Sequence, residues 1–144
     1  MVCLGNICRS PLAEGILKSK INTDSVFVDS AGTGDWHVGQ LPDSRSIEVA
    51  KIHDIDLTNQ RGRQFTQKDF SEFDYIFVMD NSNKENVLQL AQNTSEIEKV
   101  QLILDEIFPF ENVDVPDPYY GGEQGFEGVY QMLDKACDEI VKRL

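Results

Sequence analysis

The feature that most constrains this chain is the stretch from Cys3 to Pro11, where five residues separate a cysteine from an arginine directly ahead of a predicted helix. Gly5 and Asn6 tolerate the left-handed backbone that a tight turn needs, so the loop can direct its N–H groups inward. A helix N-terminus after the loop adds positive potential at the same place. The stretch therefore predicts a cradle for an anion such as phosphate.

The side chains of this stretch predict chemistry as well as binding. Positive potential favours the thiolate form of Cys3, which is the nucleophilic form. Arg9 can bind two phosphate oxygens with its planar fork, a geometry that lysine lacks. We expect Ser10 to cap the helix, and Pro11 suits its first turn. Together these residues indicate a site that binds a phosphate group and attacks it.

Length and composition limit the class of protein. A chain of 144 residues is the usual size of a single domain. No apolar run is long enough to span a bilayer and no signal peptide is recognisable, so we expect a cytoplasmic protein. Three cysteines without paired spacing argue against a disulfide scaffold and fit a reducing compartment.

The formal net charge of −12 bears on partners. An acidic protein of this size is a poor ligand for nucleic acid or an anionic membrane surface, and we expect neither as a partner. The same charge repels phosphorylated substrates. Phosphate capture must therefore come from local groups, in a small electropositive pocket within an acidic surface.

Apolar spacing predicts helices at residues 11–20, 44–53, after Asp80 and at 126–143. Short apolar runs predict strands at 26–28, 75–79 and 100–104, after a first strand that ends at Val2, whereas residues 105–125 read as irregular. This alternation predicts an α/β fold with an open parallel four-stranded sheet, of order 2-1-3-4, and helices on both faces. Cys3 then lies at the carboxyl end of a strand, where such sheets bind their ligands.

Only Met1 and Val2 precede Cys3, whereas a strand usually has about five residues. We therefore expect residues 1–144 to form one domain that lacks a few N-terminal residues of the natural protein.

Two segments of the sequence resemble motifs of a known family. The segment VCLGNICRSP, from Val2 to Pro11, is similar to the signature of the low-molecular-weight protein tyrosine phosphatases. The segment DPYY, from Asp117 to Tyr120, resembles the acid motif of that family, and the resemblance covers essentially the whole chain. It implies that Cys3 attacks phosphorus and forms a phosphocysteine. It also implies that Asp117 protonates the leaving oxygen and then activates water.

The resemblance assigns supporting roles to further residues. The phosphate-binding residues would be Leu4, Gly5, Asn6, Ile7, Cys8, Arg9 and Ser10. Ser30 would steady the loop at Asn6, which occupies its strained position. Trp36, Tyr119 and Tyr120 would wall a pocket deep enough for the ring of phosphotyrosine. No cofactor and no metal are implied, because the loop and Arg9 supply the positive charge.

Each residue also has a plainer interpretation. Asp117 can be an ordinary turn residue, and Asp114 is its competitor as the acid on chemistry alone. Cys8 can form a reversible disulfide with Cys3, as the family resemblance suggests, or simply pack in the loop. Cys137 lies on the apolar face of the last predicted helix and is expected in the core.

Other plain interpretations concern the loop residues and the histidines. Ser10 can donate a hydrogen bond to the thiolate of Cys3 as well as cap the helix, or it can be a cap alone. Trp36 can be a loop residue that packs on the surface. His37 and His53 lack metal-ligand spacing, so we interpret both as surface or cap residues.

Four functions are compatible with the motif. A tyrosine phosphatase is favoured, acting on tyrosine-phosphorylated proteins and, in bacteria, on a tyrosine kinase. A protein-arginine phosphatase is the first alternative, but a threonine stands in that branch of the family where this chain has the apolar Ile7. An inactive phosphoprotein-binding module would not need Asp117. Arsenate reduction is disfavoured, because no downstream cysteine pair exists.

Overall fold

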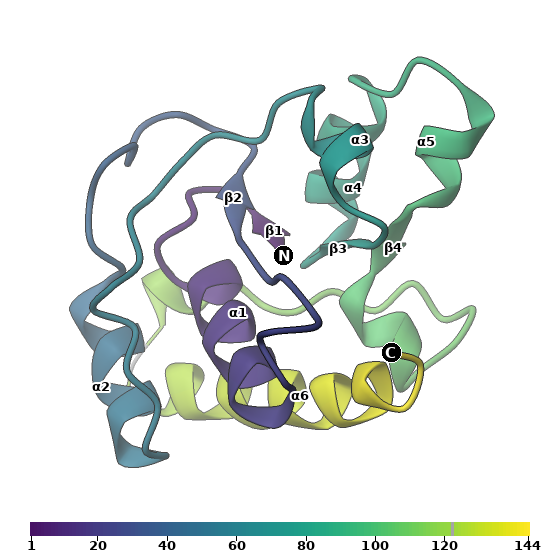
Figure 1. Ribbon diagram of the computed structural model, residues 1–144. Helices are drawn as coiled ribbons and strands as arrows, with labels where there is room; N and C mark the ends of the chain where they lie inside the picture. Colours follow the sequence, from purple (N-terminus) through teal and green to yellow (C-terminus); the bar gives the residue numbers. More distant parts are fainter. Residues whose placement is uncertain (122) are drawn as a thin grey trace.

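The computed structural model describes residues 1–121 and 123–144, without the side chains of Tyr120, Glu123 and Gln124. Its centre is a parallel sheet of four strands in the order β2-β1-β3-β4, as predicted (Figure 1). The strands are β1 (Val2–Cys3), β2 (Ala31–Gly32), β3 (Ile76–Val78) and β4 (Val100–Leu102). In the register of the central strand, Val2 pairs with Ala31 on one side and with Val78 on the other.

Helices cover both faces of the sheet, which confirms the predicted α/β class (Figure 1). One face carries α1 (Arg9–Lys20), α2 (Ser44–Ile52) and α6 (Glu123–Val141). The other face carries α3 (Asp69–Glu72), α4 (Asn81–Leu88) and α5 (Thr94–Glu98). Two 3-10 helices follow the last strand, η1 (Ile103–Glu106) and η2 (Pro118–Tyr120).

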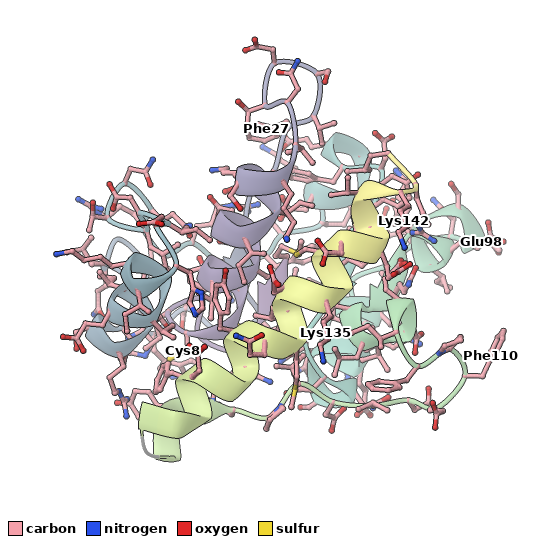
Figure 2. The ribbon with its side chains drawn as sticks, turned by 90° about the horizontal axis from the view of Figure 1, so that it is seen from below. Cys8, Phe27, Glu98, Phe110, Lys135 and Lys142 are labelled. Atoms are coloured by element: carbon pink, nitrogen blue, oxygen red, sulfur yellow. The ribbon has the colours of Figure 1, made fainter. Side chains whose placement is uncertain are left out.

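The strands build two apolar cores because successive side chains of a strand point to opposite faces. In β3, Phe77 belongs to the core beneath α1, α2 and α6, whereas Ile76 and Val78 belong to the core on the opposite face. Figure 2 shows α6 crossing the outside of the first core. The sheet is therefore buried on both faces. A ligand site is expected at the edge formed by the carboxyl ends of the strands.

The second strand differs from its prediction. Residues 26–28 form no strand, and β2 lies at Ala31–Gly32 instead. A strand needs a hydrogen-bonded neighbour, and the residues of β1 pair only with Ala31 and Gly32 along this edge. Phe27 is exposed and its ring stacks on that of Phe73, although the apolar pattern indicated a buried segment.

Other boundaries shift by a few residues. The fourth strand ends at Leu102, where η1 takes over, and α5 was not predicted. The helix caps at Asp43 and Asp80 are confirmed, because each carboxylate accepts a hydrogen bond from a backbone N–H in the first turn of its helix. No helix in residues 1–121 and 123–144 is long and apolar enough to cross a bilayer.

Candidate active site

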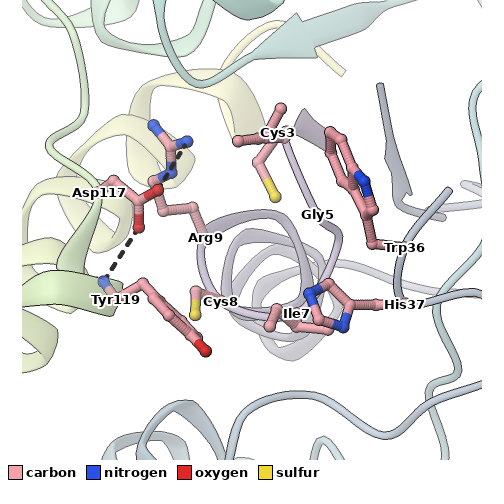
Figure 3. Close-up of a pocket in the computed structure, with 10 residues that line it drawn as sticks. Cys3, Gly5, Ile7, Cys8, Arg9, Trp36, His37, Asp117 and Tyr119 are labelled. Carbon is pink, nitrogen blue, oxygen red and sulfur yellow. Dashed lines mark hydrogen bonds and ion pairs between the residues drawn. The ribbon is translucent and has the colours of Figure 1, made fainter. Parts of the chain in front are cut away.

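A cavity of about 310 Å³ opens at the carboxyl end of β1 (Figure 3). Open α/β sheets bind ligands at the carboxyl ends of strands where the strand order reverses. The order reverses at β1, because β2 lies on one side of it and β3 and β4 lie on the other. The lining comes from the N-terminal loop (residues 4–8), its flanking residues and two distant segments: Cys3, Leu4, Gly5, Ile7, Cys8, Arg9, Trp36, His37, Asp117 and Tyr119.

The sulfur of Cys3 lies at the centre of this arrangement and points into the cavity (Figure 3). It accepts a hydrogen bond from the backbone N–H of Asn6 at 3.3 Å and lies 3.0 Å from the hydroxyl of Ser10. The Ser10 hydroxyl does not cap α1, which corrects the prediction. Helix α1 begins at Arg9 after Cys8, and no side chain caps it.

A chain of buried hydrogen bonds surrounds the hydroxyl of Ser10. Ser30 donates to the carboxylate of Glu14 at 2.6 Å, so its oxygen accepts from the Asn6 side-chain amide at 3.0 Å. The same amide nitrogen donates to Ser10 at 2.7 Å, while the Asn6 carbonyl accepts from the backbone N–H of Arg63. Ser10 is thus an acceptor in this chain, and its own proton can be donated to the sulfur of Cys3 at 3.0 Å or to the carbonyl of Ala31 at 3.5 Å, of which Cys3 is the nearer.

The predicted role of Asn6 as the strained residue agrees with its backbone. Its φ is 57°, in the left-handed region that asparagine tolerates better than most residues. Its side chain is buried and makes three of the contacts above. Ser30 meets Asn6 directly, as the resemblance implied, but Glu14 behind it was not identified from the sequence.

Arg9 is 3% exposed and is fixed from the side of β3 and α4. Its Nη1 donates to the carboxylate of Asp80 at 2.7 Å and to the carbonyl of Val115 at 2.9 Å. Its Nη2 lies 3.8 Å from the carboxylate of Asp117. The guanidinium is therefore held at the cavity wall by residues far away in the sequence. Asp80 was recognised only as a helix cap.

The two candidate acids separate clearly. Asp117 lines the cavity, and its Oδ1 accepts a hydrogen bond from the backbone N–H of Tyr119 at 3.0 Å (Figure 3). Asp114 accepts instead from the backbone and side chain of Asn81, at the start of α4, and does not line the cavity. The geometry therefore favours Asp117 over Asp114.

Aromatic side chains stand on two sides of the cavity, with Trp36 across from Tyr119 in Figure 3. Trp36 is 65% exposed and Tyr119 is 42% exposed, so both present ring surface to an incoming ligand. The side chain of Tyr120, also predicted in the wall, lies outside the described residues. His37 also lines the cavity, and its ring hydrogen-bonds Gln40 at 2.9 Å at the surface; its interpretation as a surface residue holds, but its place in the cavity lining was not predicted.

The remaining cysteines are free thiols in different surroundings. Cys8 lies in the N-terminal loop, and burial together with the nearby Asp43 carboxylate raises the pKa of its thiol to about 12. Burial likewise raises the pKa of Cys137, in the core as predicted, to about 12. Both thiols are neutral near pH 7, so neither is a candidate for a thiolate nucleophile.

Comparison with known proteins gives one consistent result. A family model described as "Low molecular weight phosphotyrosine protein phosphatase" matches residues 1–144. A low molecular weight phosphotyrosine protein phosphatase of Schizosaccharomyces pombe is 42% identical, over 99% of this chain and 94% of that protein.

Solved structures agree with the sequence comparison. A protein tyrosine phosphatase from Entamoeba histolytica has a TM-score of 0.91 at 40% identity, covering 99% of this chain and 92% of that one. An arginine phosphatase of Drosophila has a TM-score of 0.88 at 37% identity, covering 99% and 94%. The matches over the whole chain show that this protein belongs to the low molecular weight phosphotyrosine protein phosphatase family.

Proposed function

We propose that this member of the family hydrolyses phosphotyrosine in proteins through a phosphocysteine formed on Cys3. The observation that carries the proposal is that one cavity is lined by a nucleophile, a phosphate-binding cation and a proton donor: Cys3, Arg9 and Asp117. A binding module would need the cation but not the acid.

In the first step the Cys3 thiolate attacks phosphorus, and the P–S bond forms as the bond to the tyrosine oxygen breaks. The leaving oxygen takes the proton of Asp117, so a neutral phenol departs. Arg9 and the backbone of residues 4–10 hold the three equatorial oxygens and stabilise their charge in the transition state. Ser10 donates its hydroxyl proton to the sulfur, as the hydrogen-bond chain through Asn6 supports.

In the second step a water molecule replaces the phenol. Asp117, now a carboxylate, removes a proton from this water as it attacks phosphorus, and the P–S bond breaks to return the thiolate and release phosphate. No metal is required by this scheme, because Arg9 and the N-terminus of α1 supply the positive charge.

Phosphotyrosine is the substrate that the cavity suits best. The rings of Trp36 and Tyr119 can contact both faces of a phenyl group, and the apolar Ile7 lines the same cavity. A phosphoserine is too short to reach Cys3 between these walls. The physiological substrate would be a tyrosine-phosphorylated protein, for which a bacterial tyrosine kinase is one candidate.

Hydrolysis of phosphoarginine is the second candidate. It is favoured by one observation, namely the 37% identity to an arginine phosphatase of the same fold. Ile7 argues against it, because a branched apolar side chain offers no hydrogen-bond acceptor to a guanidinium group. We expect the variant Ile7→Thr to lose efficiency on phosphotyrosine and to gain it on phosphoarginine.

The proposal places the enzyme in the cytoplasm. Cys3 must remain a thiol to act as the nucleophile, and a reducing compartment maintains it. The cysteines Cys3, Cys8 and Cys137 are all free, which suits such a compartment.

The test is steady-state hydrolysis of matched phosphotyrosine and phosphoarginine peptides by the wild type, Cys3→Ser and Asp117→Asn. We expect the wild type to prefer phosphotyrosine, Cys3→Ser to be inactive, and Asp117→Asn to lose a factor of about 10² to 10⁴ in kcat/KM. A preference for phosphoarginine would overturn the substrate, and peptide binding without any turnover would identify a binding module.

A further inference from the structure

Arg45, in the first turn of α2, joins the segment that carries Asp117 to the helix that supports the N-terminal loop. We propose that Arg45 is a positioning residue, which holds Asp117 where it can protonate the leaving group. This inference rests on the proposed role of Asp117 as the acid.

The start of α2 is tied to the N-terminal loop by two hydrogen bonds. The backbone N–H of Asp43, the cap of α2, donates to the carbonyl of Ile7 at 2.7 Å. The buried hydroxyl of Ser46 donates to the carbonyl of Cys8 at 3.1 Å. The first turn of α2 is thus attached at two successive carbonyls of the loop that surrounds Cys3.

Arg45 extends from this turn to the other side of the site. Its Nη1 donates to the carbonyl of Tyr119 at 3.1 Å. Its guanidinium carbon lies 5.3 Å from the ring centroid of Tyr119 and 4.7 Å from that of Phe126, at the start of α6. One side chain therefore contacts both the backbone and the ring of Tyr119.

Asp43 fixes the orientation of the guanidinium. The Nε of Arg45 is 3.0 Å from Oδ1 of Asp43, and the Nη2 is 3.0 Å from Oδ2, in a bidentate pair. The pair aligns the planar fork, so that Nη1 is directed at Tyr119. A lysine can supply neither the fork nor the same stacking, which explains why arginine suits this position.

Tyr119 transmits this positioning to Asp117. The backbone N–H of Tyr119 donates to the carboxylate of Asp117 at 3.0 Å, within the short helix η2. Nη2 of Arg9 also approaches that carboxylate, to 3.8 Å. Arg45 therefore binds Tyr119, which in turn binds the carboxylate of Asp117, whereas Arg9 belongs to the phosphate site itself.

The consequence is a separation of effects. Loss of the Arg45 fork should misplace Asp117 without altering the phosphate site. Misplacement matters most when the leaving group is a poor one, because a poor leaving group depends on protonation in the transition state. A displacement on the order of 1 Å can cost up to about a hundredfold in rate.

The experiment measures kcat/KM on phenyl phosphate and on an activated nitrophenyl phosphate for Arg45→Met, Arg45→Lys and Arg61→Met. Arg61 is the matched control, since it is an exposed arginine bound to the nearby carbonyls of Thr58 and Gln60. We expect the phenyl to nitrophenyl ratio to fall by about tenfold to a hundredfold in Arg45→Met and by less in Arg45→Lys. In Arg61→Met the ratio should stay at the wild-type value.

Inhibition by inorganic phosphate provides the second readout, and it should change by less than about twofold in the Arg45 variants. General destabilisation lowers activity on both esters equally, so the ratio remains informative even if one variant folds poorly. A wild-type ratio in both Arg45 variants would overturn the inference. A loss of phosphate affinity as large as the fall in the ratio would overturn it as well.

Asp117→Asn distinguishes this inference from the proposed function. If Asp117→Asn lowers the ratio and the Arg45 variants do not, the role of Arg45 is wrong and the acid stands. If Asp117→Asn leaves the ratio unchanged, the acid assignment itself fails.

Discussion

At the scale of single residues, the direction of the hydrogen-bond chain matters more than the presence of its members. Glu14 accepts the proton of Ser30, and Asn6 can then only donate to Ser30 and Ser10. The nearer acceptor for the Ser10 proton is the sulfur of Cys3 at 3.0 Å, against 3.5 Å for the carbonyl of Ala31, and a proton donated there favours a negatively charged sulfur. Three neutral side chains and one buried carboxylate thereby prepare the nucleophile.

Ser10→Ala tests this arrangement. A hydrogen bond to a charged group contributes about 1.5–3 kcal/mol, so kcat/KM should fall by about tenfold to a hundredfold. Ser19→Ala is the matched control, because Ser19 lies on the same helix and donates to the carbonyl of Ile16. Steady-state assays on one phosphotyrosine peptide decide the matter, and wild-type activity in Ser10→Ala would refute the role of the hydroxyl.

The residues also show what the sequence could predict. The spacing of Cys3, Arg9 and Ser10 was sufficient to predict an anion site. Cys3 lies just before one short loop, and Arg9 and Ser10 begin the helix that follows it. The cap predicted at Ser10 was wrong. The hydroxyl of Ser10 is engaged by Cys3 and by the side chain of Asn6 instead, and local sequence rules do not include such partners.

At the scale of elements, α2 is the part that connects the two sides of the cavity. Its cap is Asp43, whose Oδ1 accepts from the backbone N–H of Arg45 at 2.9 Å. Hydrogen bonds from the Arg45 side chain are the main reason why the pKa of Asp43 is lowered from its ordinary value of 3.8. The carboxylate therefore stabilises the folded protein in its charged form.

Asp43→Ala should lower the free energy of unfolding by about 1 kcal/mol at pH 7, which is typical for the loss of a helix cap. A lowered folded-state pKa gives stability that is present above the unfolded value and lost as the pH falls below it. The difference between wild type and Asp43→Ala should thus shrink below about pH 4.

Urea denaturation at pH 7 and pH 3 provides this measurement. Glu48→Ala is the control, since Glu48 is an exposed acid in the middle of the same helix. A difference between wild type and Asp43→Ala that persists unchanged at pH 3 would show that the charge of Asp43 does not support α2.

Elements were predictable where one local pattern determined them. The apolar spacing of α6 and the caps of α2 and α4 were correct within a few residues. The strand expected at residues 26–28 was not found, because the apolar run carries no information about where a neighbouring strand pairs. Helix α5 was missed, since its five residues place no side chain in the core and leave no apolar pattern.

At the scale of the whole molecule, function depends on residues that only the fold brings together. Arg9 meets Asp80 and the carbonyl of Val115, which follow it by 71 and 106 residues. No sequence pattern predicts such contacts. Asp117 could be predicted as the acid because it lies in a recognised family motif. Arg45, Glu14 and His37 lie in no recognised motif.

The net charge of −12 acts at the same scale. An acidic surface repels an acidic phosphopeptide, so peptides with lysines around phosphotyrosine should have a higher kcat/KM than peptides with glutamates. Raising the salt concentration from about 0.01 to 0.1 M shortens the screening length from about 30 to 10 Å and should narrow this difference at least about twofold. Equal efficiency for both peptides at low salt would show that local charges alone govern capture.

The central claim is that phosphate passes through Cys3, and rapid acid quench of the reaction with a phosphotyrosine peptide tests it most directly. Mass spectrometry of the quenched protein should find one phosphoryl group on Cys3 in the wild type and none in Cys3→Ser. Asp117→Asn should accumulate more of this intermediate with an activated ester, because the carboxylate also activates the water. Turnover without any phosphoryl group on Cys3, or activity retained in Cys3→Ser, would contradict the account.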